Sequence, residues 1–125
     1  MSRRVLIVDD SMLMRRLVKE TLVADGWEVA GEACNGQEAV EKYRELRPDA
    51  VTLDIIMPES NGLDALRAIL GINPKAKVVV VSALNQTKLI SEAIRAGADD
   101  FIAKPFMPEQ LQATLQASIA GPTRP

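Results

Sequence analysis

Short runs of β-branched residues alternate with longer amphipathic segments five times along this chain, and this alternation limits its fold more than any other feature. The clearest run covers residues 77–82, where four consecutive valines fit a central parallel strand that is buried on both faces. Comparable runs occupy residues 4–8, 28–33, 50–53 and 100–103. Because strands that alternate with helices form right-handed βαβ units, the sequence predicts a doubly wound α/β domain with a parallel sheet.

Turn-forming residues separate the segments whose apolar residues recur at helical spacing. The first four helices are expected to end near Gly26, Pro48, Pro74 and Gly97. The fifth helix is expected over residues 108–120, and residues 57–62 are expected to form a loop. The sequence has no internal repeat and no second domain, so we expect one domain over residues 1–120 and a disordered tail over residues 121–125.

Composition excludes several classes of protein. The chain has 125 residues, its net charge is −2, and no apolar run is long enough to span a bilayer, so we expect neither nucleic acid nor membrane as a partner. It contains no histidine, which excludes a mechanism that uses a histidine of this chain. The single cysteine, Cys34, cannot form an internal disulfide, which favours the cytoplasm, and we expect it to be a small buried residue.

Polar residues stand at the carboxyl ends of four expected strands. Asp9 and Asp10 follow the first strand, Asp54 follows the third, Ser82 ends the valine run and Lys104 follows the last. These ends share one edge of a parallel sheet, where open α/β sheets bind ligands. Acids packed closely repel one another, and a hard dication such as Mg²⁺ suits carboxylate oxygens. The sequence therefore predicts a pocket that combines a cation site, an acid nucleophile, a hydroxyl and a lysine.

Each of these residues also has a plainer interpretation. Asp9 and Asp10 can be a solvated turn pair that caps the first helix. Lys104 can be a surface lysine before a turn proline, and Ser82 can bond to its own backbone at the end of a strand. Asp54, however, lies between apolar neighbours, and charged groups avoid such surroundings unless they are paired. The acids at two strand ends together favour the pocket.

The chain resembles the receiver domains of two-component response regulators, and the chemotaxis members most of all. The resemblance covers residues 5–119. The motifs that carry it are Val8-Asp9-Asp10-Ser11, Leu53-Asp54-Ile55-Ile56-Met57-Pro58, Asn61-Gly62, Ser82-Ala83, Gly97-Ala98-Asp99-Asp100-Phe101 and Lys104-Pro105-Phe106. It implies a flavodoxin-like (βα)5 fold with a five-stranded parallel sheet in the order 2-1-3-4-5.

The resemblance also implies roles for the residues of the pocket. Asp54 matches the phosphoacceptor, which attacks the phosphorus of a phosphohistidine on a partner kinase. Asp10 and Asp54 match direct Mg²⁺ ligands, and Asp9 matches an acid that acts through water. The backbone carbonyl of Ile56 matches the third protein ligand. Magnesium is therefore the expected cofactor.

Three further residues match parts of the family's switch. Lys104 matches the lysine that pairs with the phosphoryl group, and Ser82 matches the hydroxyl that turns to bind it. Phe101 matches an aromatic switch residue, although the residues alone would make it an ordinary core aromatic. The bond between Lys104 and Pro105 matches one that is cis in the family.

The chain departs from the family's pattern at two sites. Ile56 stands at a position that is polar in many members, and Leu84 is also apolar; we expect both to shield the acyl phosphate from water and to slow self-dephosphorylation. Residues 108–120 contain no lysine or arginine that could pair with Asp99 and Asp100. We therefore expect a monomer rather than the dimer of winged-helix regulators.

These features predict a stand-alone phosphoacceptor switch in chemotaxis that does not turn over an external substrate. Its expected partners are a histidine kinase of the chemotaxis type, a flagellar motor switch protein and a phosphatase. One alternative is a phosphorelay intermediate or a receiver fragment of a larger regulator. Another is a metal-dependent phosphatase with Asp54 as nucleophile, although such enzymes often carry an acid where this chain has Ile56.

Overall fold

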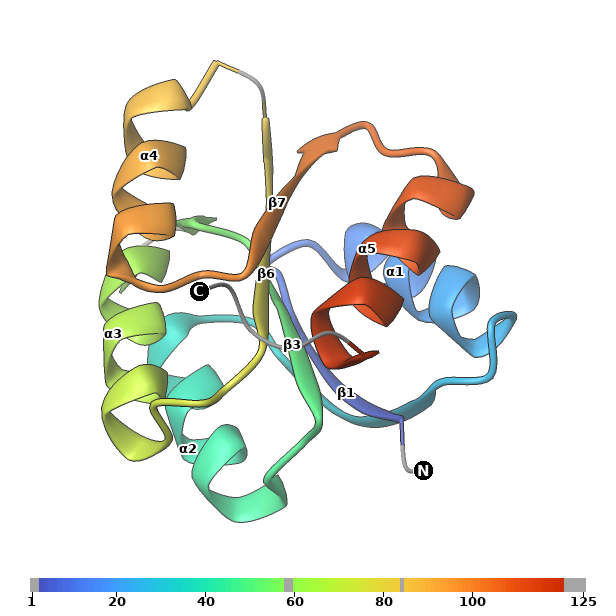
Figure 1. Ribbon diagram of the computed structural model, residues 1–125, viewed down its shortest axis with the longest axis horizontal. Helices are drawn as coiled ribbons and strands as arrows, with labels where there is room; N and C mark the ends of the chain where they lie inside the picture. Colours follow the sequence, from blue (N-terminus) through green and yellow to red (C-terminus); the bar gives the residue numbers. More distant parts are fainter. Residues whose placement is uncertain (1–2, 58–59, 84, 121–125) are drawn as a thin grey trace.

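A five-stranded parallel sheet forms the centre of the molecule (Figure 1). The computed structural model describes residues 3–57, 60–83 and 85–120. The long strands are β1 (Arg4–Val8), β2 (Glu28–Ala33), β3 (Ala50–Leu53), β6 (Val78–Ala83) and β7 (Asp100–Lys104). They lie in the order β2-β1-β3-β6-β7, and every neighbouring pair is parallel. Numbered among themselves, these five strands have the order 2-1-3-4-5, so the predicted fold is confirmed.

Helices cover both faces of the sheet (Figure 1). They are α1 (Met12–Val23), α2 (Gly36–Leu46), α3 (Gly62–Ile72), α4 (Thr87–Ala96) and α5 (Pro108–Ala120). Helices α1 and α5 lie on one face, and α2, α3 and α4 lie on the other (Figure 1). No helix among the described residues combines the length and the apolar character that a membrane span requires.

Each central strand divides its side chains between two hydrophobic cores. Leu6 and Val8 of β1 pack in the core under α2, α3 and α4, whereas Val5 and Ile7 pack in the core under α1 and α5. The four valines of β6 are divided in the same alternating way. Because both faces of β1, β3 and β6 are covered, apolar residues occupy consecutive positions in these strands.

The ends of the helices follow the local chemistry of the sequence. The side-chain oxygens of Ser11 and Asn35 accept hydrogen bonds from the amides three residues later, at 3.1 and 2.8 Å, and so cap α1 and α2. Gly97 directly follows α4, and Gly26 lies three residues after the end of α1; their φ angles of 121° and 90° fall in a region that favours glycine. Arg47 ends α2 with a φ of 47°.

The segment expected as a loop contains a short hairpin. Strands β4 (Ile56–Met57) and β5 (Ser60–Asn61) pair in antiparallel fashion. Immediately after it, the Gly62 amide donates a 3.1 Å hydrogen bond to the carbonyl of Ile55. The sequence identified the turn residues. It did not identify the strand pairing on either side of them, because that pairing depends on the position of α3.

Cys34 is exposed, so the expectation of a buried cysteine was wrong. It lies just beyond the last residue of β2 and directly before Asn35, the N-cap of α2. Its amide donates a 2.9 Å hydrogen bond to Oε1 of Glu38, which ties this connection to the first turn of the helix. A small apolar side chain is usually buried. Cys34, however, lies in a connection at the edge of the sheet, where its side chain does not face a hydrophobic core.

The apolar stripe of α1 is wider than the face that the helix buries. Val18 and Leu22 are buried, whereas Leu13 and Leu17 of the same stripe are 67% and 43% exposed. Helical spacing alone could not show which residues of the stripe are buried and which are exposed. Two other expectations, the tail over residues 121–125 and the role of Leu84, lie outside the described residues.

The two glycines of α3 provide a stability test. A Cβ at Gly62 would lie 2.4 Å from Cα of Ile55 and 2.6 Å from the carbonyl oxygen of Asp54, so the backbone would have to shift. We expect Gly62→Ala to lower the free energy of unfolding by about 1–3 kcal/mol. A Cβ at Gly71 would meet nothing within 4 Å, and Gly71→Ala should instead raise stability by up to about 1 kcal/mol. Urea unfolding curves measure both changes, and equal effects would contradict this assignment.

Candidate functional site

Three strand ends bring charged side chains together at the carboxyl edge of the sheet. Asp9 and Asp54 follow β1 and β3, and Lys104 ends β7. The ladder extends beyond the strands, because the amide of Asp9 donates to the carbonyl of Ala33 and the amide of Asp54 donates to that of Val8, each at 3.0 Å. These bonds place the two acids side by side, level with each other at the carboxyl edge of the sheet.

The acids form a compact cluster with one lysine. Asp9 and Asp54 are buried, Asp10 is exposed, and one carboxylate oxygen of each lies within 4.8 Å of the others. The ammonium of Lys104 donates a 2.9 Å hydrogen bond to Oδ2 of Asp9 and lies 3.4 Å from Oδ2 of Asp54. The predicted meeting of these four residues at one edge is therefore observed.

The remaining carboxylate oxygens are held by backbone amides. Oδ1 of Asp54 accepts a 3.1 Å hydrogen bond from the amide of Ile56. Oδ1 of Asp9 accepts a 2.9 Å hydrogen bond from the amide of Ser11. Both buried acids are thus fixed in orientation. The plainer interpretation of Asp9 and Asp10 as a solvated pair does not hold for Asp9, which is buried, although Asp10 is exposed.

Burial and charge shift the pKa values of two groups in the cluster. Burial raises the pKa of Asp54, and the charge of Asp9 raises it further, while the amide of Ile56 and the charge of Lys104 act against this shift. Burial alone would lower the pKa of the Lys104 ammonium, but its hydrogen bond to Asp9 and the two carboxylate charges raise it overall. Lys104 is therefore charged at neutral pH.

The donor set suits a hard divalent cation. All three acids offer oxygen, and one lysine cannot neutralise three carboxylates. Asp10 has the exposed carboxylate, so a cation bound there would remain open to solvent on one side. Asp9, Asp10 and Asp54 could hold such an ion; a contribution from the Ile56 carbonyl stays a prediction.

A cavity of about 210 Å³ opens beside Asp54. Its lining comes from Asp54, Ile56, Ser82, Ala83, Gln86 and Lys104. The hydroxyl of Ser82 is buried and has no hydrogen-bond partner among the described residues. An unpartnered buried hydroxyl is costly, so this one is poised to donate to an anion that enters the cavity.

Phe101 lies on the same face of the sheet as Ser82. In the register of β6 and β7, Val80 pairs with Phe101 and Ser82 pairs with Ala103, and paired residues of parallel strands point to the same side. Phe101 is half-buried rather than a fully buried core aromatic. The bond between Lys104 and Pro105 is cis, as the resemblance implied.

Sequence reasoning missed two residues near the cluster. Gln86 lines the cavity from the connection between β6 and α4, and no pattern in the sequence marks it. Arg15 on α1 donates a 2.7 Å hydrogen bond to the carbonyl of Asp9. Its position five residues after Asp10 was a possible clue, because a long side chain early in a helix can reach back past the N-terminus of that helix.

Residues 5–116 match the family model of the response regulator receiver domain. The chain belongs to this family. CheY of Thermotoga maritima is 57% identical over 111 residues, which are 89% of this chain and 92% of the relative. CheY of Bacillus subtilis is 49% identical over 111 residues, with the same coverage of both chains. The chain is thus a receiver domain of a two-component system, and it is similar to chemotaxis regulators.

Solved structures agree with this assignment. A chain of the CheX–CheY complex with BeF3 and Mg²⁺ from Borrelia burgdorferi superposes with a TM-score of 0.89 at 32% identity. The match covers 94% of this chain and 90% of that chain. Receiver domains bind Mg²⁺ at an acidic pocket, and the cluster of Asp9, Asp10 and Asp54 has the composition of such a pocket.

The raised pKa of Asp54 predicts how stability depends on pH. The folded state binds more protons than the unfolded state between the ordinary value of 3.8 and the higher folded value, so stability falls as pH rises through that window. We expect Asp54→Asn to relieve this penalty and to raise the melting temperature at pH 7 without metal by about 3–5 °C, as a gain on the order of 1 kcal/mol would. Thermal unfolding by circular dichroism measures the shift.

Asp64→Asn is the matched control, because Asp64 lies in the first turn of α3 with a side chain that is 79% exposed. It should give no gain at pH 7. The gain of Asp54→Asn should vanish well below pH 3.8, where the carboxyl group is protonated in both states. A loss of stability in Asp54→Asn at pH 7 would contradict the electrostatic account.

Proposed function

We propose that Asp54 accepts a phosphoryl group from a phosphohistidine of a partner kinase and that the chain then acts as a chemotaxis switch. The observation that carries this proposal is the buried Asp54 carboxylate, which shares the Lys104 ammonium with Asp9 and opens onto the cavity lined by Ser82. The chain has no histidine, so the donor lies on another protein. Its likeness to CheY proteins supports the pathway.

Transfer depends on position and charge rather than on a general base. A carboxylate oxygen of Asp54 forms a bond to phosphorus while the bond between phosphorus and the donor's histidine nitrogen breaks. Lys104 lies close enough to pair with an oxygen of the transferred group, and Ser82 can donate to another. Mg²⁺ held by Asp9, Asp10, Asp54 and the Ile56 carbonyl would offset the negative charge of the group.

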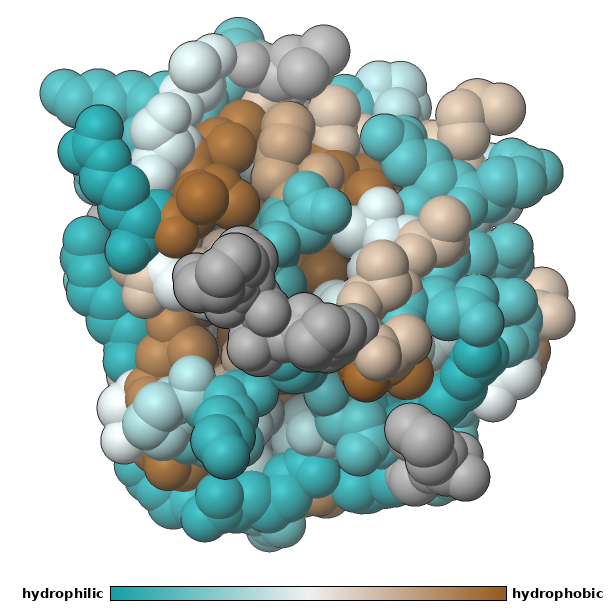
Figure 2. All heavy atoms as spheres, viewed as in Figure 1, coloured by the Kyte–Doolittle hydropathy of each residue, from teal (hydrophilic) through white to brown (hydrophobic). Residues whose placement is uncertain are grey.

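The same cavity links phosphorylation to a distant surface. When the Ser82 hydroxyl turns toward the phosphoryl group, space opens on the face that Phe101 shares with it. Phe101 then moves inward, and the surface of α4, β7 and α5 changes. Figure 2 shows apolar side chains gathered beside α4. Ile94 on α4 is 42% exposed, which suits an apolar contact with a partner.

We propose a flagellar motor switch protein as the partner of this surface and a chemotaxis kinase as the donor. The CheX–CheY complex of the solved relative supports a further partner, which we propose to be a phosphatase. The alternative of a metal-dependent phosphatase receives no support from the cavity, because Ile56 lines it where such enzymes often carry an acid.

The phosphoacceptor is tested by intact mass. Incubation with Mg²⁺ and acetyl phosphate should add one phosphoryl group to the wild-type chain, because Asp54 faces the cavity beside Lys104. Asp54→Asn should remain unmodified, and Asp64→Asn, with its exposed acid, should behave as wild type. Phosphoryl addition that persists in Asp54→Asn would overturn the assignment, as would wild-type modification that is unaffected by EDTA.

Ile56 is expected to set the lifetime of the acyl phosphate. Ile56 is 46% exposed and lines the cavity beside Asp54, so its apolar side chain would keep water away from the acyl phosphate. We expect Ile56→Asn to speed phosphate loss roughly fivefold, which corresponds to about 1 kcal/mol of barrier. Release of phosphate from the phosphorylated protein, followed after the donor is removed, gives the rate.

Val23→Asn is the control for this test, since Val23 is 50% exposed at the far end of α1 and makes no part of the cavity. It should leave the lifetime unchanged. Equal lifetimes for wild type and Ile56→Asn would refute the shielding role.

A further inference from the structure

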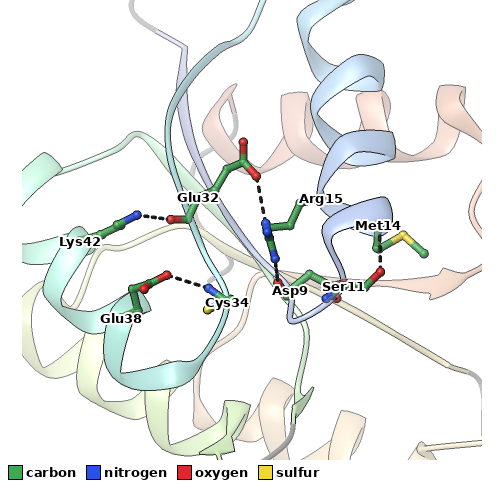
Figure 3. Close-up of polar contacts among 8 residues, drawn as sticks. All are labelled: Asp9, Ser11, Met14, Arg15, Glu32, Cys34, Glu38 and Lys42. Carbon is green, nitrogen blue, oxygen red and sulfur yellow. Dashed lines mark hydrogen bonds and ion pairs between the residues drawn. The ribbon is translucent and has the colours of Figure 1, made fainter.

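Arg15 joins the acid cluster to the neighbouring strand through two hydrogen bonds (Figure 3). Its Nη1 donates to the main-chain carbonyl of Asp9 at 2.7 Å. Its Nε donates to Oε1 of Glu32, on β2, at 2.9 Å, and this contact is also an ion pair. The Arg15 side chain is only 16% exposed, although that of Glu32 is 37% exposed, so both bonds are partly buried. A planar guanidinium with two fixed partners holds its position far better than a surface arginine in open solvent.

We propose that Arg15 is a positioning residue for the divalent cation site. The Asp9 carbonyl belongs to the peptide that joins Asp9 to Asp10, so a bond to this oxygen fixes the plane of that peptide. The orientation of this peptide plane sets the position of the Asp10 backbone. It therefore also sets where the exposed Asp10 carboxylate lies relative to Asp54. This proposal rests on the proposed function, because it concerns the same cation.

The other contacts of Asp9 act on a different part of the residue. The carboxylate of Asp9 is held by the amide of Ser11 and by Lys104, and its amide is held by Ala33. These bonds fix the Asp9 side chain and the peptide bond that precedes Asp9. The bond from Arg15 acts instead on the carbonyl side, which leads to Asp10. Asp9 is thus clamped at both of its peptide bonds.

Glu32 acts as the anchor of the clamp. Its main-chain carbonyl accepts a hydrogen bond from the ammonium of Lys42 on α2, and its carboxylate holds Arg15 (Figure 3). The chain of contacts therefore runs from α2 through β2 to α1 and ends at the acid cluster. Partners of this kind around metal ligands change metal affinity roughly 10–100-fold when they are removed.

Charge and position predict opposite results, which makes the proposal testable. Arg15 is a cation bound to the main chain of Asp9, one of the three clustered acids, so loss of its charge alone would strengthen binding of a dication. Loss of its positioning bond would weaken binding. We expect Arg15→Gln to weaken Mn²⁺ binding roughly tenfold. The free Mn²⁺ signal in electron paramagnetic resonance measures this without any phosphoryl donor.

Two variants separate the alternatives. Arg16→Gln removes the same charge from the next residue, whose side chain is 75% exposed, and should not weaken binding. Arg15→Lys keeps the charge but cannot form the two-branched contact to Asp9 and Glu32, so it should also weaken binding. Wild-type affinity in Arg15→Lys would overturn the proposal.

A second measurement guards against simple misfolding. Glu32→Gln leaves the bond from Arg15 to Asp9 in place and removes only the anchoring charge, so it should weaken Mn²⁺ binding roughly threefold in a folded protein. In metal-free protein, the ¹³C shift of the Asp9 carbonyl should change in Arg15→Gln and stay constant in Arg16→Gln. An unchanged shift in Arg15→Gln would overturn the proposal.

The outcomes distinguish this inference from the proposed function. If wild type binds Mn²⁺ and Arg15→Gln binds as tightly as Arg16→Gln, the positioning role fails while the cation site stands. If wild type does not bind Mn²⁺, or if Asp54→Asn binds it as tightly as wild type, the cation site fails, and the inference fails with it.

Discussion

The ammonium of Lys104 allows two aspartates to be buried side by side. Without it, Asp9 and Asp54 would be like charges out of water, and such an arrangement is costly enough to force one acid to take up a proton. One lysine is too few for three acids, so the cluster keeps an excess of negative charge. This excess of negative charge favours a bound cation.

The sheet supplies the geometry that this charge arrangement needs. Asp9, Asp54 and Lys104 all continue the alternation that sends Ile7 and Val79 into the core under α1 and α5. Ser82 instead continues the alternation of Val80, toward α4. The charged groups and the hydroxyl therefore approach the cavity from opposite faces of one sheet. This arrangement supports the proposal that an event at Asp54 reaches the α4 side through Ser82.

The sequence predicted the elements that depend on local chemistry. The valine run and the turn at Gly26 are short-range features, and the structure places them as expected. The first helix is capped by Ser11 and not by Asp9 or Asp10, which the plainer interpretation had suggested. The convergence of the acids with Lys104 was predictable because parallel strands share their carboxyl edge. Exposure was harder to predict: Cys34 is exposed because tertiary docking, rather than residue type, decides which side of a connection faces the core.

The missed contacts share a physical reason. Arg15, Glu32 and Lys42 come from three elements, and Arg15 and Lys42 reach the side chain and the main chain of Glu32 only after α1 and α2 have packed on opposite faces of the sheet. No spacing along the chain encodes such a meeting. The hairpin of β4 and β5 has a similar origin, since its pairing depends on the close approach of Gly62 to Ile55.

The exposed thiol of Cys34 has a practical consequence. It is the only sulfhydryl in the sequence, and it stands just past the end of β2, on the same rim as the acidic cluster. A maleimide dye or nitroxide attached there would label the native chain at one position, with no engineered residue. Such a reporter would sense rearrangement of the rim directly, whereas the single tryptophan, Trp27, is buried before the opposite end of β2.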